Sequence, residues 1–276
     1  MDSYSPFSVS PRFLLRSVWE NRQLIAQLTS REIIGRYRGS VLGVFWSFVT
    51  PVFMLAIYTF VFSVVFKARW GLAGGESKAE FALLLFAGLI VFNLFSECLT
   101  RAPSLILSHA TYVKKVVFPL EILPWVSMGS ALFHAAISLL VWLIAYGVFY
   151  GHPHVSVLLL PVVLFPFVLL VMGLSWFLAS LGVYLRDISN LIGTLLTVLM
   201  FLSPIFYPVS ALPEKYRVYL YLNPLTPVVE QVRNILYWGG GVNWAAYVLY
   251  ALMSLAVALM GFVWFQNTRR GFADVL

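Results

Sequence analysis

The segment LIGTLLTVLMFLSPIFYPVSALPEKYRVYLYLNPLTPVVEQVRNILYWGGG, residues 191–241, carries the pattern that decides the fold. It begins as an uninterrupted apolar helix and breaks at Pro204 and Pro208, because proline lacks an amide donor and clashes with the preceding turn. A short aromatic-rich segment follows at 212–222. Pro224 ends that segment, because the residue before a proline avoids helical geometry. The segment therefore cannot continue as one straight membrane helix.

A second short helix is predicted after this break, with Thr226 as its N-cap and Pro227 at its first position. Its apolar stripe at helical spacing comprises Val228, Val229, Val232, Ile235 and Leu236. The polar face is predicted to comprise Glu230, Gln231, Arg233 and Asn234. About twelve residues make about 18 Å of helix, too short for a bilayer core of about 30 Å. Because irregular backbone at membrane depth needs protein or a water-filled cavity around it, we predict a re-entrant pore-mouth hairpin.

The composition places the chain among multi-pass membrane proteins. It is 61% hydrophobic and 11% charged, whereas about a quarter of the residues of a soluble domain are charged. The single cysteine, Cys98, excludes an internal disulfide and a multi-cysteine metal site, and no metal site is predicted. The net charge of +7 suits anionic lipid headgroups. Nucleic-acid binding is not expected, because the basic residues are not gathered on one soluble domain.

The expected fold is an all-α integral membrane protein with one domain, 1–276, and six transmembrane helices. The spans are predicted at 42–66, 81–99, 122–150, 155–184, 188–207 and 243–265. Residues 1–40 are interpreted as an amphipathic interface helix on the membrane surface, with a disordered basic tail as the alternative. Residues 208–242 are predicted to form the re-entrant pair of short helices between spans 5 and 6, and 266–276 to form a cytoplasmic tail.

The distribution of Lys and Arg predicts the orientation. Alternate sides of the predicted membrane hold twelve and six of these residues. The richer side, which includes both termini, is expected to be cytoplasmic, and 208–242 is expected to face out.

The sequence offers little for catalysis or ion coupling. Glu97 and Glu121 are predicted at the inner ends of spans, so no charge is expected near mid-membrane, which argues against ion coupling. His134 is interpreted as a helix–helix hydrogen-bond partner rather than a catalyst. No Ser/His/Asp, HExxH or P-loop motif occurs, so no enzymatic activity is expected and the chain needs no cofactor of its own.

The inner segment 98–121 is the longest cytoplasmic connection and is interpreted as a docking surface for a soluble partner, with a mere connector as the alternative. Pro103 is expected to start a short helix with an apolar knob. The predicted coupling residues are Pro103, Leu105, Ile106, Lys114 and Lys115.

Glycines at 35, 39 and 43 leave two alternatives, a small face on a helix or a hinge before span 1.

Aromatic side chains in spans 1 and 5 could stack on sugar rings, although lipid contact is the simpler interpretation for each one. The predicted channel-lining aromatics are Tyr58, Phe62, Phe201, Phe206 and Tyr207. The predicted gate residues are Pro204, Pro208, Val232 and Ile235, with apolar stripes packed on spans 5 and 1.

Four segments together resemble one known family. They are REIIGRYRGSVLGVFWSFVTPVFMLAIYTFVF (31–62), YVKKVVFPLEILP (112–124), YLRDISNLIG (184–193), and FLSPIFYPVSALPEKY with LNPLTPVVEQVRNILYWG (201–239). In order and spacing they resemble the permease subunit of type-2 ABC exporters for polysaccharides, which move O-antigen, capsule or teichoic acid.

The resemblance implies a homodimer of permeases with two separate ATP-binding subunits, so that ATP is bound by the partner. It also implies an interface helix, a coupling helix between spans 2 and 3, gate helices between spans 5 and 6, and a channel lined by spans 1 and 5. A polyprenyl-pyrophosphate-linked glycan would enter from the cytoplasmic leaflet of the inner membrane. Candidate ligands for its pyrophosphate are Arg31, Arg36 and Arg38, although anchoring to anionic lipids explains them equally well.

The resulting hypothesis is that this chain is the membrane subunit of an ATP-driven exporter and that the exported glycan is O-antigen. The alternative from another class is a stand-alone proton-coupled lipid or glycan flippase. An integral-membrane acyltransferase or glycosyltransferase is a third interpretation.

Overall fold

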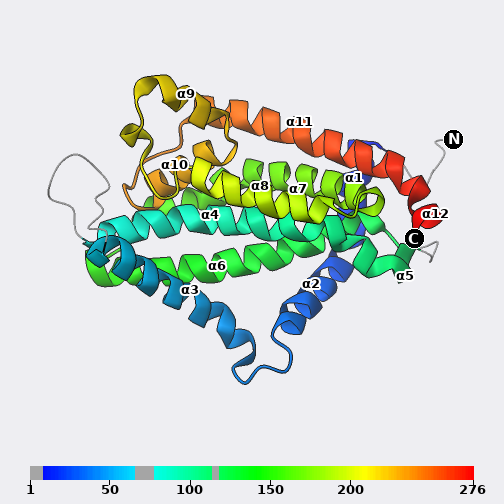
Figure 1. Ribbon diagram of the computed structural model, residues 1–276, viewed down its shortest axis with the longest axis horizontal. Coiled ribbons are helices and arrows are strands. Elements are labelled where there is room, and N and C mark those ends of the chain that lie inside the picture. The colour runs from blue at the N-terminus through cyan, green and yellow to red at the C-terminus, as the bar shows by residue number, and fades with distance from the viewer. Residues whose placement is uncertain (1–8, 66–77, 114–117) are drawn as a thin grey trace.

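The computed structural model describes residues 9–65, 78–113 and 118–276, which form an elongated bundle of helices without a strand in these ranges (Figure 1). The α-helices are α1 (Pro11–Glu20), α2 (Arg22–Arg36), α3 (Trp46–Tyr58), α4 (Lys78–Leu105), α5 (Ala110–Val113), α6 (Leu123–Tyr150), α7 (Leu160–Tyr184), α8 (Ile188–Leu202), α9 (Glu214–Leu222), α10 (Leu225–Leu236), α11 (Trp244–Thr268) and α12 (Phe272–Val275). A π-helix, Thr59–Val65, continues α3.

Helix α4 is the centre of the bundle. It packs against α6, α7, α8 and α10, and nearly every residue of its N-terminal half is buried. The backbones of helices α7 and α11 are in direct contact at Gly173 and Gly261. A Cβ atom at Gly261 would lie only 2.0 Å from the Gly173 carbonyl oxygen, so only glycine fits there. Gly182 packs equally closely on the Pro103 carbonyl of α4. Small residues at such crossings are how membrane helices associate without a hydrophobic driving force.

Five described helical segments are long and apolar enough to cross a membrane, so the chain is a multi-pass membrane protein. They are 43–62, 79–105, 120–150, 155–184 and 244–275. Helix α8, predicted as a span over 188–207, is shorter and ends at Leu202. Pro204 cannot donate a backbone hydrogen bond, which explains why the helix stops before it.

The predicted coupling segment differs from its expected form. Pro103 lies inside α4 instead of starting a new helix, and Leu105 and Ile106 are buried in the bundle instead of forming an exposed knob. Their aliphatic side chains gain more from packing against neighbouring helices than from exposure to water. The predicted coupling residues Lys114 and Lys115 lie outside the described residues.

The N-terminal region divides into two helices rather than one. Amphipathic character is concentrated in α1, and α2 ends at Arg36. Gly39 and Gly43 have φ angles of 86° and 54°, values that favour glycine, and they form an elbow between α2 and α3. No neighbouring side chain or backbone approaches the Cβ position of either one. This region is therefore a hinge and not a small helix face.

The two short helices predicted between spans 5 and 6 are α9 and α10, at the opposite end of the bundle from α5 and α12 (Figure 1). Helix α10 begins at Leu225, one residue before the predicted N-cap Thr226, because the Asn223 side chain accepts a hydrogen bond from the Leu225 amide at 3.0 Å. The apolar stripe of α10 packs on α4 and α7, not on spans 1 and 5 as predicted.

Candidate functional site

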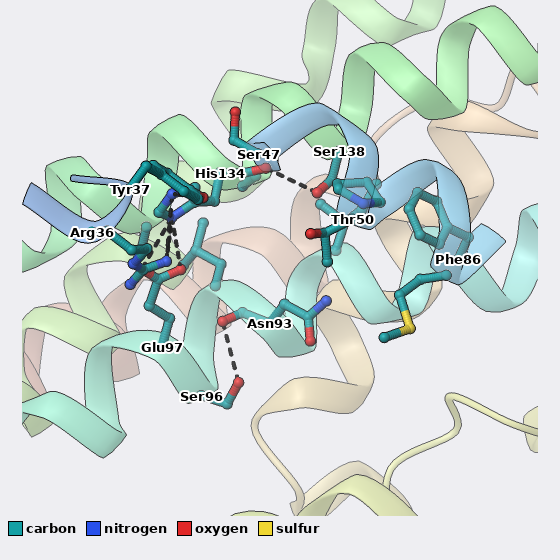
Figure 2. Close-up of a pocket in the computed structure, with 16 residues that line it drawn as sticks. Arg36, Tyr37, Ser47, Thr50, Phe86, Asn93, Ser96, Glu97, His134 and Ser138 are labelled. Carbon is teal, nitrogen blue, oxygen red and sulfur yellow. Dashed lines mark hydrogen bonds and ion pairs between the residues drawn. The ribbon is translucent and has the colours of Figure 1, made fainter. Parts of the chain in front are cut away.

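A polar cavity of about 380 Å³ lies beneath the α2–α3 elbow, against α4 and α6. One end is lined by charged and aromatic side chains, Arg36, Tyr37, Glu97 and His134. Further along are hydroxyl and amide groups, Ser47, Thr50, Asn93, Ser96 and Ser138, and an apolar wall of Pro51, Met54, Phe86, Ile90, Leu94, Ala131 and Ala135 (Figure 2). The volume falls within the range of about 300–1,000 Å³ of small-molecule sites.

Glu97 holds the charged end of the cavity together. Its carboxylate accepts a hydrogen bond from the Arg36 guanidinium at 2.5 Å, and both of its oxygens lie 3.1 Å from His134 Nδ1. The Tyr37 hydroxyl lies 3.2 Å from His134 Nε2. Arg101, one turn further along α4, is 3.7 Å from Glu97 and also contacts Glu32 of α2. This confirms the hypothesis that His134 joins helices.

Helix α4 is longer than the predicted span 2. Span 2 was expected to end at residue 99, but α4 continues to Leu105, so Glu97 lies two turns inside the helix. The cluster contains two guanidinium groups and two carboxylates, and His134 adds charge only when protonated. Because these charges balance, the charged end of the cavity has no excess of either sign.

The predicted pyrophosphate ligands occupy different environments. Arg36 is engaged with Glu97 and His134, whereas Arg31 and Arg38 are exposed and share a shallow surface cleft with Ile34. Of these three arginines, only Arg31 and Arg38 are open to an anion without first breaking an ion pair inside the described structure.

In α10, Arg233 occupies a place that the sequence analysis did not foresee. It was predicted on the polar face of α10, but its side chain is fully buried. Its guanidinium donates to the carbonyl oxygens of Leu84 at 2.8 Å, Pro204 at 2.5 Å and Ile205 at 2.9 Å. Glu230, 3.3 Å away, is its ionic partner.

The proline break explains why Arg233 is needed there. Ending α8 at Leu202 leaves the carbonyls of Pro204 and Ile205 outside a helix, and buried carbonyls require a donor. Gly88 provides the room, because a Cβ atom at that position would lie 2.8 Å from Arg233 Nη2. A signal was present in the sequence, since residues 229, 232, 233 and 236 share one helix face.

The predicted channel-lining aromatics lie together. Phe62 stacks on Phe206 with ring centroids 5.9 Å apart, and Phe206 stacks on Phe201 at 5.8 Å. Tyr58 packs against Phe62 at 6.4 Å, and the Tyr207 hydroxyl donates to the Phe201 carbonyl at 3.1 Å. The structure therefore joins spans 1 and 5 through one aromatic cluster, and its contact with substrate remains a prediction.

A second buried charged residue, Glu121, joins helices at the end of the bundle that holds α12 (Figure 1). It is 2% exposed, accepts a hydrogen bond from the Ser17 hydroxyl at 2.8 Å, and pairs with Arg269 at 2.6 Å. Arg269 also donates to the Phe118 carbonyl at 2.9 Å, and the Trp176 indole donates to the Glu121 carbonyl at 3.0 Å. The last residues of the predicted docking segment 98–121 are thus tied to α1, α7 and the residue that follows α11.

Comparison with known proteins now becomes decisive. The family model described as ABC-2 type transporter matches residues 23–237. The chain belongs to the ABC-2 type transporter family. Membrane subunits of this family typically pair with an ATP-binding subunit.

Relatives of this ABC-2 chain align along almost its whole length. It is 29% identical over 269 residues to the O-antigen export system permease protein RfbA of Myxococcus xanthus, covering 95% of this chain and 98% of the relative. RfbA of Klebsiella pneumoniae is 24% identical over 257 residues, covering 92% and 95%. The polysialic acid transport protein KpsM of Escherichia coli is 25% identical over 253 residues, covering 89% and 95%.

Proposed function

We propose that this ABC-2 chain is the membrane subunit of an ATP-driven exporter that moves a polyprenyl-pyrophosphate-linked polysaccharide, specifically O-antigen, across the inner membrane. The observation that carries the proposal is the end-to-end alignment with an O-antigen export permease, which leaves no large segment of either chain unmatched. The relatives named for capsule and polysialic acid transport support the broader class of polysaccharide.

The proposed topology has six spans, with α8 as the short fifth span. Fifteen residues make about 22 Å of helix, so α8 crosses the membrane only together with the bent segment that follows it. Both termini are cytoplasmic, α1 and α2 lie at the inner interface, and α9 and α10 face outward. The excess of Lys and Arg on the terminal side supports this orientation.

The proposed assembly is a homodimer of this chain with two ATP-binding subunits. Large apolar side chains on α3 and α8 are exposed in the single chain, including Phe53, Val198 and Phe201. A second copy that met these faces would bury them and enclose a channel between spans 1 and 5. Docking of the ATP-binding subunit falls to the exposed side of the inner segment, at Ser104, Ser108 and Thr111.

The proposed pyrophosphate ligands are Arg31 and Arg38, because both guanidinium groups are exposed. Guanidinium groups bind phosphate oxygens through paired, charge-assisted hydrogen bonds. Arg36 is a ligand only if the anion displaces Glu97, which makes it the weaker candidate.

Reconstitution tests this function. The chain would be purified with its cognate ATP-binding subunit and incorporated into liposomes that contain the lipid-linked glycan from its source cells. ATP hydrolysis is expected to drive the glycan to the opposite leaflet, detected by a glycan-specific antibody. A permease that carries the glycan without ATP, or that does not co-purify with the ATP-binding subunit, would contradict the proposal.

A second candidate is a proton-coupled flippase that acts alone. The observation in its favour is the Glu97–His134 contact two turns inside α4, since titratable groups within membrane helices are typical of proton relays. A protonophore distinguishes the two functions, because it abolishes proton-coupled transport and leaves ATP-driven transport in liposomes unchanged.

A further inference from the structure

The middle of the polar cavity contains two side chains with unused hydrogen-bonding capacity. Thr50 of α3 and Asn93 of α4 both line it and are both exposed in the single chain. Within residues 9–65, 78–113 and 118–276, neither the Thr50 hydroxyl nor the Asn93 amide group has a hydrogen-bond partner. Figure 2 shows both between the charged cluster and Phe86.

The exposure of Asn93 is unusual for its helix. Residues 81–92 of α4 are all buried, and Asn93 is the first residue after them that faces out of the bundle. A polar side chain on an apolar membrane helix is costly in lipid and usually faces protein or a water-filled cavity. The amide therefore marks a polar path along α4 and not a lipid-facing surface.

The charge balance of the cavity selects the kind of ligand. Glu97 and Glu32 together balance Arg36 and Arg101, so the cluster beside the cavity offers no surplus cation to a pyrophosphate. What the cavity offers is a row of groups that both donate and accept hydrogen bonds, beside an apolar wall that includes Pro51 and Phe86. A sugar ring has this same division, with hydroxyl groups at its edge and CH groups on its faces.

We propose that this cavity is a saccharide-binding site, which holds neutral sugar units of the transported glycan at Thr50 and Asn93. The proposal rests on the proposed export function. It adds a polar sugar-binding site that is distinct from the aromatic cluster of Phe62, Phe201 and Phe206. The pyrophosphate is bound elsewhere, at exposed cations, while the first sugar units occupy the cavity.

The first test is substrate affinity in the reconstituted complex. Asn93→Leu should raise the lipid-linked glycan concentration for half-maximal transport about two- to tenfold, since one hydrogen bond is worth about 0.5–1.5 kcal/mol. Asn93→Gln, which keeps the amide, should restore most of the parent's value. The matched control is Asn267→Leu on α11, another exposed asparagine that is remote from the cavity lining, and it should change nothing.

The second test is chemical protection. In a Cys98→Ser background, Asn93→Cys should react with a neutral, water-soluble methanethiosulfonate reagent, and the lipid-linked glycan should slow that reaction when a non-hydrolysable ATP analogue arrests transport. Ile144→Cys, on the exposed face of α6, should react slowly with or without glycan.

The outcomes separate this proposal from the function on which it rests. If the parent complex transports glycan, but Asn93→Leu matches Asn267→Leu and glycan does not protect Asn93→Cys, the saccharide site is wrong and the exporter stands. If the parent fails to transport glycan with ATP, the proposed function itself fails.

Discussion

The two ends of the bundle each bury a charged side chain, but they stabilise it in opposite ways. At the end that holds α12, Glu121 and Arg269 neutralise each other and join segments from both termini and the middle of the chain. At the end that holds α9 and α10, Arg233 is surrounded mainly by backbone carbonyls, and its acidic partner Glu230 is partly exposed. The Glu121–Arg269 pair thus links elements that are already helical, whereas Arg233 binds backbone carbonyls that a proline break has left without helical partners.

Helices α9 and α10 differ in how firmly they are held by the rest of the bundle. Helix α10 is anchored in the core by Arg233 and its apolar stripe, whereas α9 makes its main contacts with α10 and the short turn before it. Tyr219 and Leu222 of α9 are 69% and 76% exposed. We infer that α10 is a fixed support and that α9 is the part of the hairpin that closes the path.

Replacing Arg233 should have the largest effect. Arg233→Met leaves the Leu84, Pro204 and Ile205 carbonyls without this donor, and a buried unsatisfied group costs about 1–3 kcal/mol, so the loss should total roughly 3–9 kcal/mol. The free energy of unfolding in mixed detergent would measure it. The control is Arg217→Met on α9, whose guanidinium also binds carbonyls but at the surface, and which should lose less than about 1 kcal/mol. Equal losses would remove the distinction between the buried and surface arginines.

Neutralising Glu121 should have the next largest effect. Glu121→Gln keeps the shape of the side chain but leaves Arg269 without its buried counter-charge, at a cost of about 2–4 kcal/mol. The same unfolding assay applies, with Glu20→Gln as the control, because the exposed Arg16–Glu20 pair should contribute less than about 0.5 kcal/mol. A loss no larger than that of the control would mean that the inner ion pair does not hold the termini.

Filling the space at Gly88 should have the smallest effect of the three. Gly88→Ala places a methyl group against the Arg233 guanidinium and should cost about 1–2 kcal/mol through overpacking. Gly147→Ala on α6, where nothing lies within 4 Å, should be neutral or slightly stabilising. The two variants can be compared by the temperature at which each unfolds in detergent. If Gly88→Ala is as stable as Gly147→Ala, Arg233 does not depend on this space.

The lengths of the apolar segments and the positions of the prolines between them predicted most of the fold. The long helices and the two short helices between α8 and α11 follow from such local signals in the sequence. The environment of Arg233 does not, because its acceptors come from residues 28, 29 and 149 positions away. Leu105 and Ile106 were misplaced for a related reason, since a short apolar sequence does not reveal whether it packs on its own bundle or on a partner.

The candidate site was predicted only in part. His134 was expected to join helices, and the aromatic residues of spans 1 and 5 do lie together. Asn93 was overlooked although it is the sole asparagine in predicted span 2. The ion-pair contacts of Glu97 with Arg36 and Arg101 were not predicted either, because Arg101 can approach Glu97 only if α4 continues past residue 99. Hydropathy alone cannot find a polar cavity that is lined by residues of four separate helices.

The central claim is that this chain encloses part of a polar transport path whose outer end is closed by α9. The most direct measurement is the ionic conductance of the purified complex in planar bilayers. Tyr219→Ser with Leu222→Ser should raise conductance above that of the parent, because a hydrophobic seal works by excluding water. The control, Leu249→Ser with Leu252→Ser on the exposed face of α11, should leave conductance unchanged. Parent-level conductance from a folded, assembled α9 variant would contradict the claim and make the hairpin a passive cap.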